Sequence, residues 1–127
     1  MRSIKNKIIK IIIFILIILF VSAIKVKAVT IVLDPGHGGS DPGAMNSRAG
    51  IIESDVNYKI ATYLKEYLEK YENVKVVLTR KQDEYKTLQE RANVGFNNNA
   101  DLLLSLHINS SDSEDATGCE RICYIQN

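Results

Sequence analysis

Short apolar runs alternate with amphipathic stretches along most of the chain. Three runs rich in aliphatic residues predict strands: 29–33 (VTIVL), 74–80 (VKVVLTR) and 101–109 (DLLLSLHIN). The third run is apolar enough for us to expect that both of its faces are covered. A polar loop follows it, and the segment after that loop, 119–126 (CERICYIQ), is a candidate fourth strand.

The chain between these runs repeats apolar residues at helical spacing. This spacing predicts one helix over 56–72, whose apolar face is expected to pack on the sheet, and a second helix over 86–98. The apolar stripes comprise Val56, Ile60, Leu64 and Tyr67 or Leu68 in the first helix, and Leu88, Ala92, Gly95 and Phe96 in the second. Ser54 and Asp55 are expected to cap the first helix.

The order strand, helix, strand, helix, strand predicts an α/β fold. Its sheet would be mostly parallel, flanked by helices and joined by right-handed crossovers. In such sheets ligands bind at the carboxyl ends of the strands. His37 follows the first strand and His107 lies near the end of the third, and they are the only two histidines in the chain. Both are therefore expected at the functional edge of the sheet.

The first 28 residues have a different character from the rest. Several basic residues precede an almost unbroken apolar stretch over 11–24, and the small residue Ala28 follows. The apolar stretch is shorter than the roughly 20 residues that a membrane-spanning helix needs. We therefore predict a signal peptide over 1–28, with an uncleaved membrane anchor as the alternative. The mature domain, 29–127, would be secreted and would have no stable membrane span.

Removal of this segment changes the charge balance. Ten basic and 15 acidic residues remain, which gives the mature chain a net charge of −5. A nucleic-acid partner is excluded on this basis, because phosphate binding needs a basic surface.

Cys119 and Cys123 would lie about 13 Å apart on one strand, beyond the reach of a disulfide, so we predict two buried free thiols.

The stretch LDPGHGGSDPGA, residues 33–44, places His37 in a turn rich in glycine and proline. This turn opens a long loop from Gly36 to Gly50, and long loops inside compact domains are usually functional. Two imidazoles and one carboxylate can hold a zinc ion and leave a position open for water. Glu53 is the best candidate for the carboxylate, because it follows the loop directly and precedes a helix. The same three side chains would also suit non-haem iron.

Common nucleotide and hydrolase motifs do not explain these glycines. The run GHGGSD has Asp41 where a dinucleotide-binding loop has its third glycine. The chain also contains neither a phosphate-binding Gly-Lys-Ser/Thr sequence nor the Gly-x-Ser-x-Gly turn of serine hydrolases.

Four motifs together resemble those of a known family. They are IVLDPGHGGSDPGA, GIIESDVN, VVLTR and LQERANVGFNNNADLLLSLHINS, and they cover Ile31 to Ser110. The chain resembles the zinc-dependent N-acetylmuramoyl-L-alanine amidases of the bacterial cell-wall hydrolase type. The resemblance implies that His37, Glu53 and His107 are zinc ligands. It also implies the substrate, the amide between the lactyl group of N-acetylmuramic acid and L-alanine in peptidoglycan, and hence a protein associated with the cell wall.

Other positions of the family pattern suggest roles outside the ligand set. Arg80 and Arg91 match family positions, and we expect both to be structural or ion-paired. In the family, the general base is a glutamate in a C-terminal motif. No such motif occurs before Asn127, so we expect 29–127 to be an incomplete catalytic domain whose base lies beyond Asn127.

Three hypotheses follow from these observations. The first is a peptidoglycan amidase, and the second is a catalytically inactive remnant that binds zinc or peptidoglycan. The third is an unrelated iron enzyme with two histidine ligands. No oligomeric state is predicted.

Overall fold

The computed structural model describes residues 2–22, 27–111, 115 and 117–120. The elements along the chain are α1 (Arg2–Ser22), β1 (Val29–Pro35), β2 (Met45–Asn46), β3 (Ile51–Ile52), α2 (Glu53–Leu68), β4 (Val74–Leu78), α3 (Leu88–Asn97) and β5 (Leu102–Leu106). Each of the three strands expected from the sequence is present, and so are both helices expected after the first strand.

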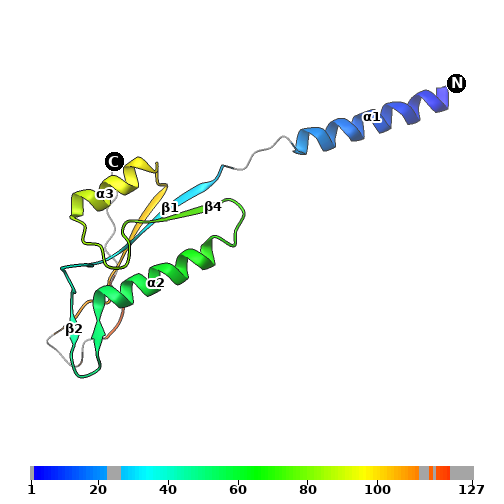
Figure 1. Cartoon of the computed structure of the whole chain (residues 1–127). Coiled ribbons are helices and arrows are strands. Elements are labelled where there is room, and N and C mark those ends of the chain that lie inside the picture. The colour runs from blue at the N-terminus through cyan, green and yellow to red at the C-terminus, as the bar shows by residue number, and fades with distance from the viewer. Residues whose placement is uncertain (1, 23–26, 112–114, 116, 121–127) are drawn as a thin grey trace.

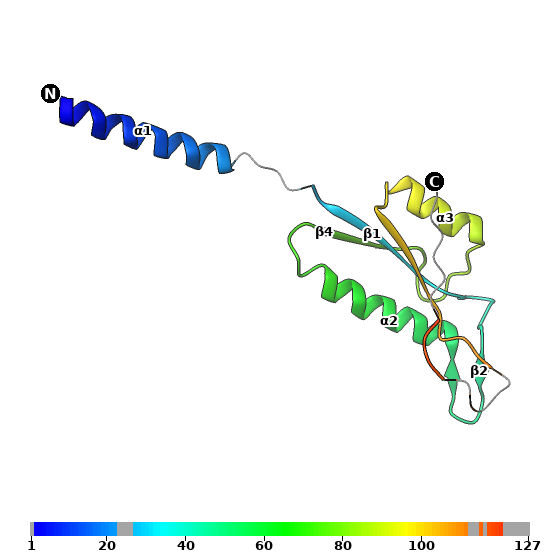
Figure 2. The ribbon, with the colours of Figure 1, turned by 180° about the vertical axis from the view of Figure 1, so that it is seen from behind.

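The three long strands form one parallel sheet in the order β4-β1-β5. Strand β1 lies in the middle, with Leu33 opposite Leu78 of β4 and Leu104 of β5. Helices α2 and α3 flank this sheet (Figures 1 and 2). The predicted α/β fold is therefore confirmed, and the carboxyl ends of all three strands meet at one edge.

The core lies between the sheet and α2. Its buried residues are Leu33, Ala61 and Val76. Partly buried aliphatic residues pack around them: Ile31, Leu64, Leu68, Val74, Leu78 and Leu106. Alternate positions of β1 and β4 supply this face, as expected for strands whose side chains alternate between the two sides of a sheet.

The buried face of α2 includes Leu64 and Leu68 of the predicted stripe but differs from it at other positions. Ile60 and Tyr67 are 42% and 57% exposed, whereas Asn57 and Ala61 are fully buried. The small Ala61 allows the helix to lie close to the sheet, and Asn57 faces the functional edge. The helix also begins at Glu53 with Ile52 as its N-cap residue, so neither Ser54 nor Asp55 caps it.

The predicted apolar stripe of α3 is confirmed at Gly95 but wrong at Leu88 and Phe96. Leu88 and Phe96 are 85% and 79% exposed, and the buried residues of this helix are Arg91 and Gly95. A Cβ atom at Gly95 would lie 3.0 Å from Leu103 Cδ1, so the helix packs closely on β5 at this glycine. The Arg91 side chain points inward and pairs with Asp34, so Leu88 and Phe96 of the predicted apolar stripe face solvent.

Strand β5 is not covered on both faces, contrary to the expectation for 101–109. It is the last strand on its side of the described sheet, and Leu102, Leu103 and Leu104 are all exposed. Helix α3 reaches Leu103 at Gly95, but Leu102, Leu103 and Leu104 remain 50%, 42% and 38% exposed in the described part of the chain.

The long loop after β1 contains regular structure that the sequence did not predict. A bridge joins Gly38 to Asp41. Beyond it, β2 pairs with β3 in an antiparallel hairpin, with Met45 opposite Ile52. The hairpin leads directly into α2 and so sets the position at which that helix begins.

The two ends of the chain bear on other predictions. Helix α1 extends away from the sheet (Figure 1), and no helix among the described residues is both long and apolar enough to cross a membrane. The signal peptide over 1–28 stays a prediction.

Cys119 is a free thiol but is exposed, so its predicted burial is wrong. Cys123 and most of the candidate strand 119–126 lie outside the described residues, and Cys119 and Glu120 are not in a strand.

Truncation of Leu33 tests this core. Because Leu33 is fully buried at the centre of the core, Leu33→Ala should lower the free energy of unfolding by about 2–5 kcal/mol. Leu88→Ala removes the same atoms from a side chain that is 85% exposed and should change stability by about 0.5 kcal/mol or less. Urea denaturation of both full-length variants measures the difference, and equal effects would contradict this description of the core.

Candidate metal centre

His37 lies in the turn directly after β1, with a backbone that few non-glycine residues adopt. Its φ is 59°, in the left-handed region, and the next residue, Gly38, has φ 126°. The guanidinium of Arg91 fixes this turn by donating from Nη2 to the His37 carbonyl at 2.8 Å. The ring places Nδ1 2.8 Å from Asp41 Oδ2 and Nε2 3.4 Å from Glu53 Oε2.

Glu53 is the first residue of α2 and is almost fully buried. Its Oε2 accepts a hydrogen bond from the Ala44 N–H at 2.9 Å, and its Oε1 accepts one from the Ile108 N–H at 3.2 Å. Burial acts to raise the pKa of Glu53, but the Ala44 N–H, His107 and His37 together hold it below its usual value. The carboxylate is therefore kept charged inside the domain, as a metal ligand must be.

His107 follows β5 and faces the same point. Its Nδ1 lies 3.1 Å from Glu53 Oε1, and its ring stands edge-on to that of His37, with 4.8 Å between the centroids. A Cβ atom at Gly36 would lie 2.3 Å from the His107 ring, so a residue with a side chain at this position would displace the imidazole. The glycine after Pro35 is needed for this close approach.

The three residues predicted as ligands are thus brought together from three separate elements. One ligand atom from each of His37, Glu53 and His107 lies within 4.8 Å of the other two. Two nitrogens and one carboxylate oxygen form a donor set that fits zinc with an open coordination position, and it also fits iron. The side chains of His37 and His107 are 25% and 40% exposed, against 4% for Glu53. The open side of the cluster is therefore the side of the histidines.

Asp34 is a buried carboxylate near the three predicted ligands, and its sequence position did not indicate a role in the site. Asp34, on β1, accepts hydrogen bonds from Thr79 Oγ1 at 2.5 Å and Arg91 Nη1 at 2.8 Å through Oδ1, and from Ser105 Oγ at 2.8 Å through Oδ2. Thr79 directly follows β4, and Ser105 lies on β5. One side chain therefore joins the carboxyl ends of all three strands.

The two arginines singled out by the family pattern are both structural. Arg91 forms a buried ion pair with Asp34, as predicted. Arg80 is also buried and donates to the carbonyls of Pro35 at 2.8 Å, Gly36 at 3.1 Å and Ser54 at 3.0 Å. Burial, followed by the positive charge of Arg91, lowers the pKa of Arg80. Its role is to hold the turn before His37 against the start of α2.

Two further polar side chains contact the ligands, and neither was singled out as part of the site. Asp41 contacts His37 Nδ1, and this contact, followed by the Gly43 N–H, lowers the pKa of the Asp41 carboxyl. Asn57 is fully buried one turn after Glu53, with Nδ2 3.5 Å from Glu53 Oε1 and 3.4 Å from the Gly36 carbonyl. Asp41 stands four residues after His37, a short spacing that could have drawn attention to it.

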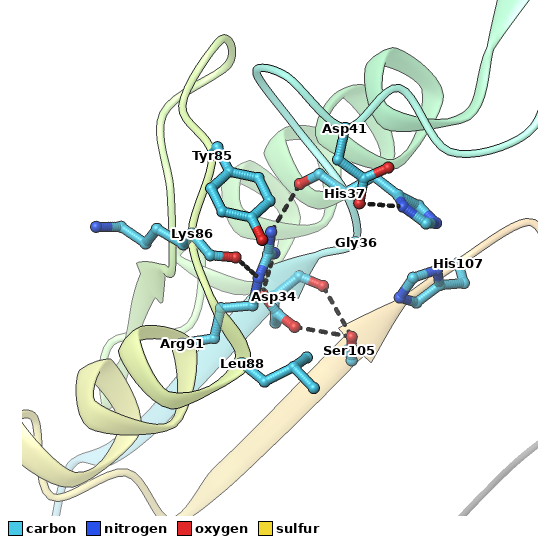
Figure 3. Close-up of a pocket in the computed structure, with 10 residues that line it drawn as sticks. All are labelled: Asp34, Gly36, His37, Asp41, Tyr85, Lys86, Leu88, Arg91, Ser105 and His107. Atoms are coloured by element: carbon cyan, nitrogen blue, oxygen red, sulfur yellow. Dashed lines mark hydrogen bonds and ion pairs between the residues drawn. The ribbon is translucent and has the colours of Figure 1, made fainter.

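An open pocket of about 200 Å³ lies beside the two histidines (Figure 3). Its lining residues are Asp34, Gly36, His37, Asp41, Tyr85, Lys86, Leu88, Arg91, Ser105 and His107. Tyr85 and Leu88 lie on the side of the pocket away from His107 and are 52% and 85% exposed. The pocket therefore offers an aromatic and an aliphatic side chain to a ligand that reaches the cluster.

Comparisons with known proteins give one consistent result. The family model described as N-acetylmuramoyl-L-alanine amidase matches residues 31–127. The "Probable N-acetylmuramoyl-L-alanine amidase AmiB" of Haemophilus influenzae is 41% identical over 109 residues, which are 86% of this chain and 25% of that protein. The sporulation-specific N-acetylmuramoyl-L-alanine amidase of Bacillus subtilis is 42% identical over 97 residues, which are 76% of this chain and 36% of that protein.

Solved structures agree with these sequence matches. The crystal structure of an N-acetylmuramoyl-L-alanine amidase from Clostridium difficile 630 superposes with a TM-score of 0.69 at 38% identity, over 73% of this chain and 50% of that one. The chain thus spans about a quarter to a third of these two curated relatives and half of the solved chain.

Loss of Arg91 tests the ion pair with Asp34. Arg91→Leu leaves a buried carboxylate without its charged partner and should destabilise the protein by about 3–5 kcal/mol in urea denaturation. Adding Asp34→Asn to Arg91→Leu should recover part of that loss, because the unpaired charge is removed. All variants are made in the full chain, 1–127, in which the control Lys27→Leu breaks the exposed ion pair with Asp101 and should have a much smaller effect. A double variant less stable than Arg91→Leu would contradict the pairing.

Proposed function

Because the chain belongs to the N-acetylmuramoyl-L-alanine amidase family, we propose that it hydrolyses the amide between N-acetylmuramic acid and L-alanine in peptidoglycan, with zinc as its cofactor. The observation that carries the proposal is the convergence of His37, Glu53 and His107 within 4.8 Å at the carboxyl edge of the sheet. The family resemblance read from the sequence motifs is confirmed.

In this proposal His37 and His107 hold the metal through neutral imidazole nitrogens, and Glu53 holds it through its carboxylate. The hydrogen bonds from the Ala44 and Ile108 N–H groups keep Glu53 oriented before the metal binds. When bound, zinc would polarise the amide carbonyl and lower the pKa of a coordinated water toward about 7. Glu53 is buried and both histidines are partly exposed, so the amide would approach from the side of the histidines.

The proton of the attacking water must pass to the leaving amine through a general base. Within the described part of the chain, the two other carboxylates of the pocket are already engaged. Asp34 accepts hydrogen bonds from Thr79, Arg91 and Ser105, and Asp41 contacts His37. We assign the base to neither residue. The second candidate function is binding of zinc and peptidoglycan without hydrolysis.

The proposed site of action follows from the substrate. Peptidoglycan lies outside the cytoplasmic membrane, and the segment 1–28 would direct export as a signal peptide. The proposal therefore places the mature chain, 29–127, outside the cell in contact with the cell wall.

Incubation of the full chain with purified peptidoglycan tests the proposal. We expect zinc to bind at one equivalent, and we expect new L-alanine amino termini, measured by amine labelling and mass spectrometry of the released peptides. A chelator should abolish their release, and added zinc should restore it. Glu53→Gln should lose both zinc binding and release, because a neutral amide is a much poorer ligand than a carboxylate.

The alternatives give different results in the same experiment. Stoichiometric zinc without new amino termini would refute hydrolysis by this chain and support the binding function. A preference for iron over zinc in elemental analysis of the purified protein, with oxidised products, would support the iron enzyme instead. Retention of zinc by Glu53→Gln at wild-type affinity would refute the ligand set.

Tyr85 gives a separate test of the pocket. Its exposed ring lies beside the two histidines in the pocket. The variant Tyr85→Ala should weaken peptidoglycan binding by about 1 kcal/mol, roughly five-fold. Tyr63→Ala is the matched control, because Tyr63 is 70% exposed on α2 and does not line this pocket. Co-sedimentation of the zinc-loaded full chain with peptidoglycan measures both variants. Equal binding by Tyr85→Ala and Tyr63→Ala would exclude Tyr85 from the binding surface.

A further inference from the structure

The two ring nitrogens of His37 face two different carboxylates. Nδ1 lies 2.8 Å from Asp41 Oδ2, and Nε2 lies 3.4 Å from Glu53 Oε2 on the other side of the ring. Figure 3 shows the Asp41 carboxylate beside the imidazole, on the rim of the pocket. The contact with Glu53 lies within the ligand cluster, whereas the contact with Asp41 lies outside it.

A neutral imidazole carries one proton and can place it on either nitrogen. An ionised carboxylate can only accept a hydrogen bond, and the Asp41 oxygen, at 2.8 Å from Nδ1, is closer to the ring than the Glu53 oxygen, at 3.4 Å from Nε2, so the contacts favour the form with the proton on Nδ1. That form leaves the lone pair of Nε2 free inside the ligand cluster, beside Glu53, where one cation could bind both atoms. In metal sites, an acceptor on the second nitrogen of a ligating histidine fixes both the tautomer and the ring orientation.

Asp41 is itself held in place by the loop that carries it. Its Oδ1 accepts the Gly43 N–H at 3.1 Å, and its backbone exchanges two hydrogen bonds with Gly38, at 2.7 and 3.1 Å. A Cβ atom at Gly43 would lie 2.6 Å from the His37 ring and 2.9 Å from Glu53 Oε2. The chain thus passes closely beside both ligands, and the next residue, Ala44, donates to Glu53.

We propose that Asp41 is a positioning residue that holds His37 in the Nδ1–H form and directs Nε2 to the metal. The proposal rests on the metal site of the proposed function and adds a group outside the ligand set. A role in turn formation alone would make Asp41 matter for stability but not for the tautomer of His37 or for metal affinity. The two roles can therefore be separated by measurement.

The full chain with Asp41→Ala or Asp41→Asn provides the test. Zinc affinity, measured by competition with a chromophoric chelator, should fall about 10- to 100-fold for Asp41→Ala. Asp41→Asn keeps an oxygen acceptor and should lose less. The chain contains only two histidines, so 15N-labelled histidine gives signals from two rings only. In the metal-free protein, His37 should be in the Nδ1–H form in wild type and should shift toward the Nε2–H form in Asp41→Ala.

Asp83→Ala is the matched control, because Asp83 is an exposed acidic residue that does not line the pocket of His37. It should leave the zinc affinity and both ring signals unchanged. Urea denaturation of all variants reports any loss of folding. A comparison of the cobalt(II) absorption spectra of wild type and Asp41→Ala shows whether the ligand geometry has changed.

Two results would overturn the proposal. One is Asp41→Ala with zinc affinity within two-fold of wild type, and the other is an unchanged His37 tautomer in that variant. Failure of the wild-type chain to bind zinc would instead refute the metal site of the proposed function. The tautomer is measured without metal, so it would still show whether Asp41 controls the His37 ring.

Discussion

The buried ion pair between Asp34 and Arg91 holds together the edge of the sheet on which the site is built. The Asp34 carboxylate also accepts hydrogen bonds from Thr79 and Ser105, so one group ties the ends of β1, β4 and β5. Arg91 comes from α3 and reaches past Asp34 to the carbonyl of His37. Because a buried charge that loses its partner is costly, the strand ends cannot shift separately without a large loss of stability. The positions of the ligands depend on this constraint.

The elements and the general place of the site could be predicted because their signals are local. Runs of aliphatic residues indicate strands, and apolar spacing indicates helices, within windows of roughly 11–18 residues. Parallel topology then places residues after β1 and β5 at one edge, which is why His37 and His107 could be expected to meet. Glu53 could be expected as the third member, because it follows closely after the loop that carries His37.

The features that could not be predicted from the sequence depend on contacts between residues far apart in the chain. Arg91 lies beside the predicted apolar stripe of α3 and would usually point to solvent, but it is buried against Asp34, which is 57 residues away, and the helix turns this side inward. Asn57 is buried on α2 where Ile60 was expected, because the helix starts at Glu53 and turns that face to the functional edge. A pattern of polarity along one sequence contains no information on such pairs.

The three proposed ligands are not held equally firmly. Glu53 is fixed by two backbone N–H groups. His37 is held through its carbonyl by Arg91 and contacts Asp41 through its ring. His107 lies against Gly36 and, among the described residues, contacts Glu53 through a ring nitrogen, and its side chain is the most exposed of the three. The least constrained of the three proposed ligands therefore lies on the open side of the cluster.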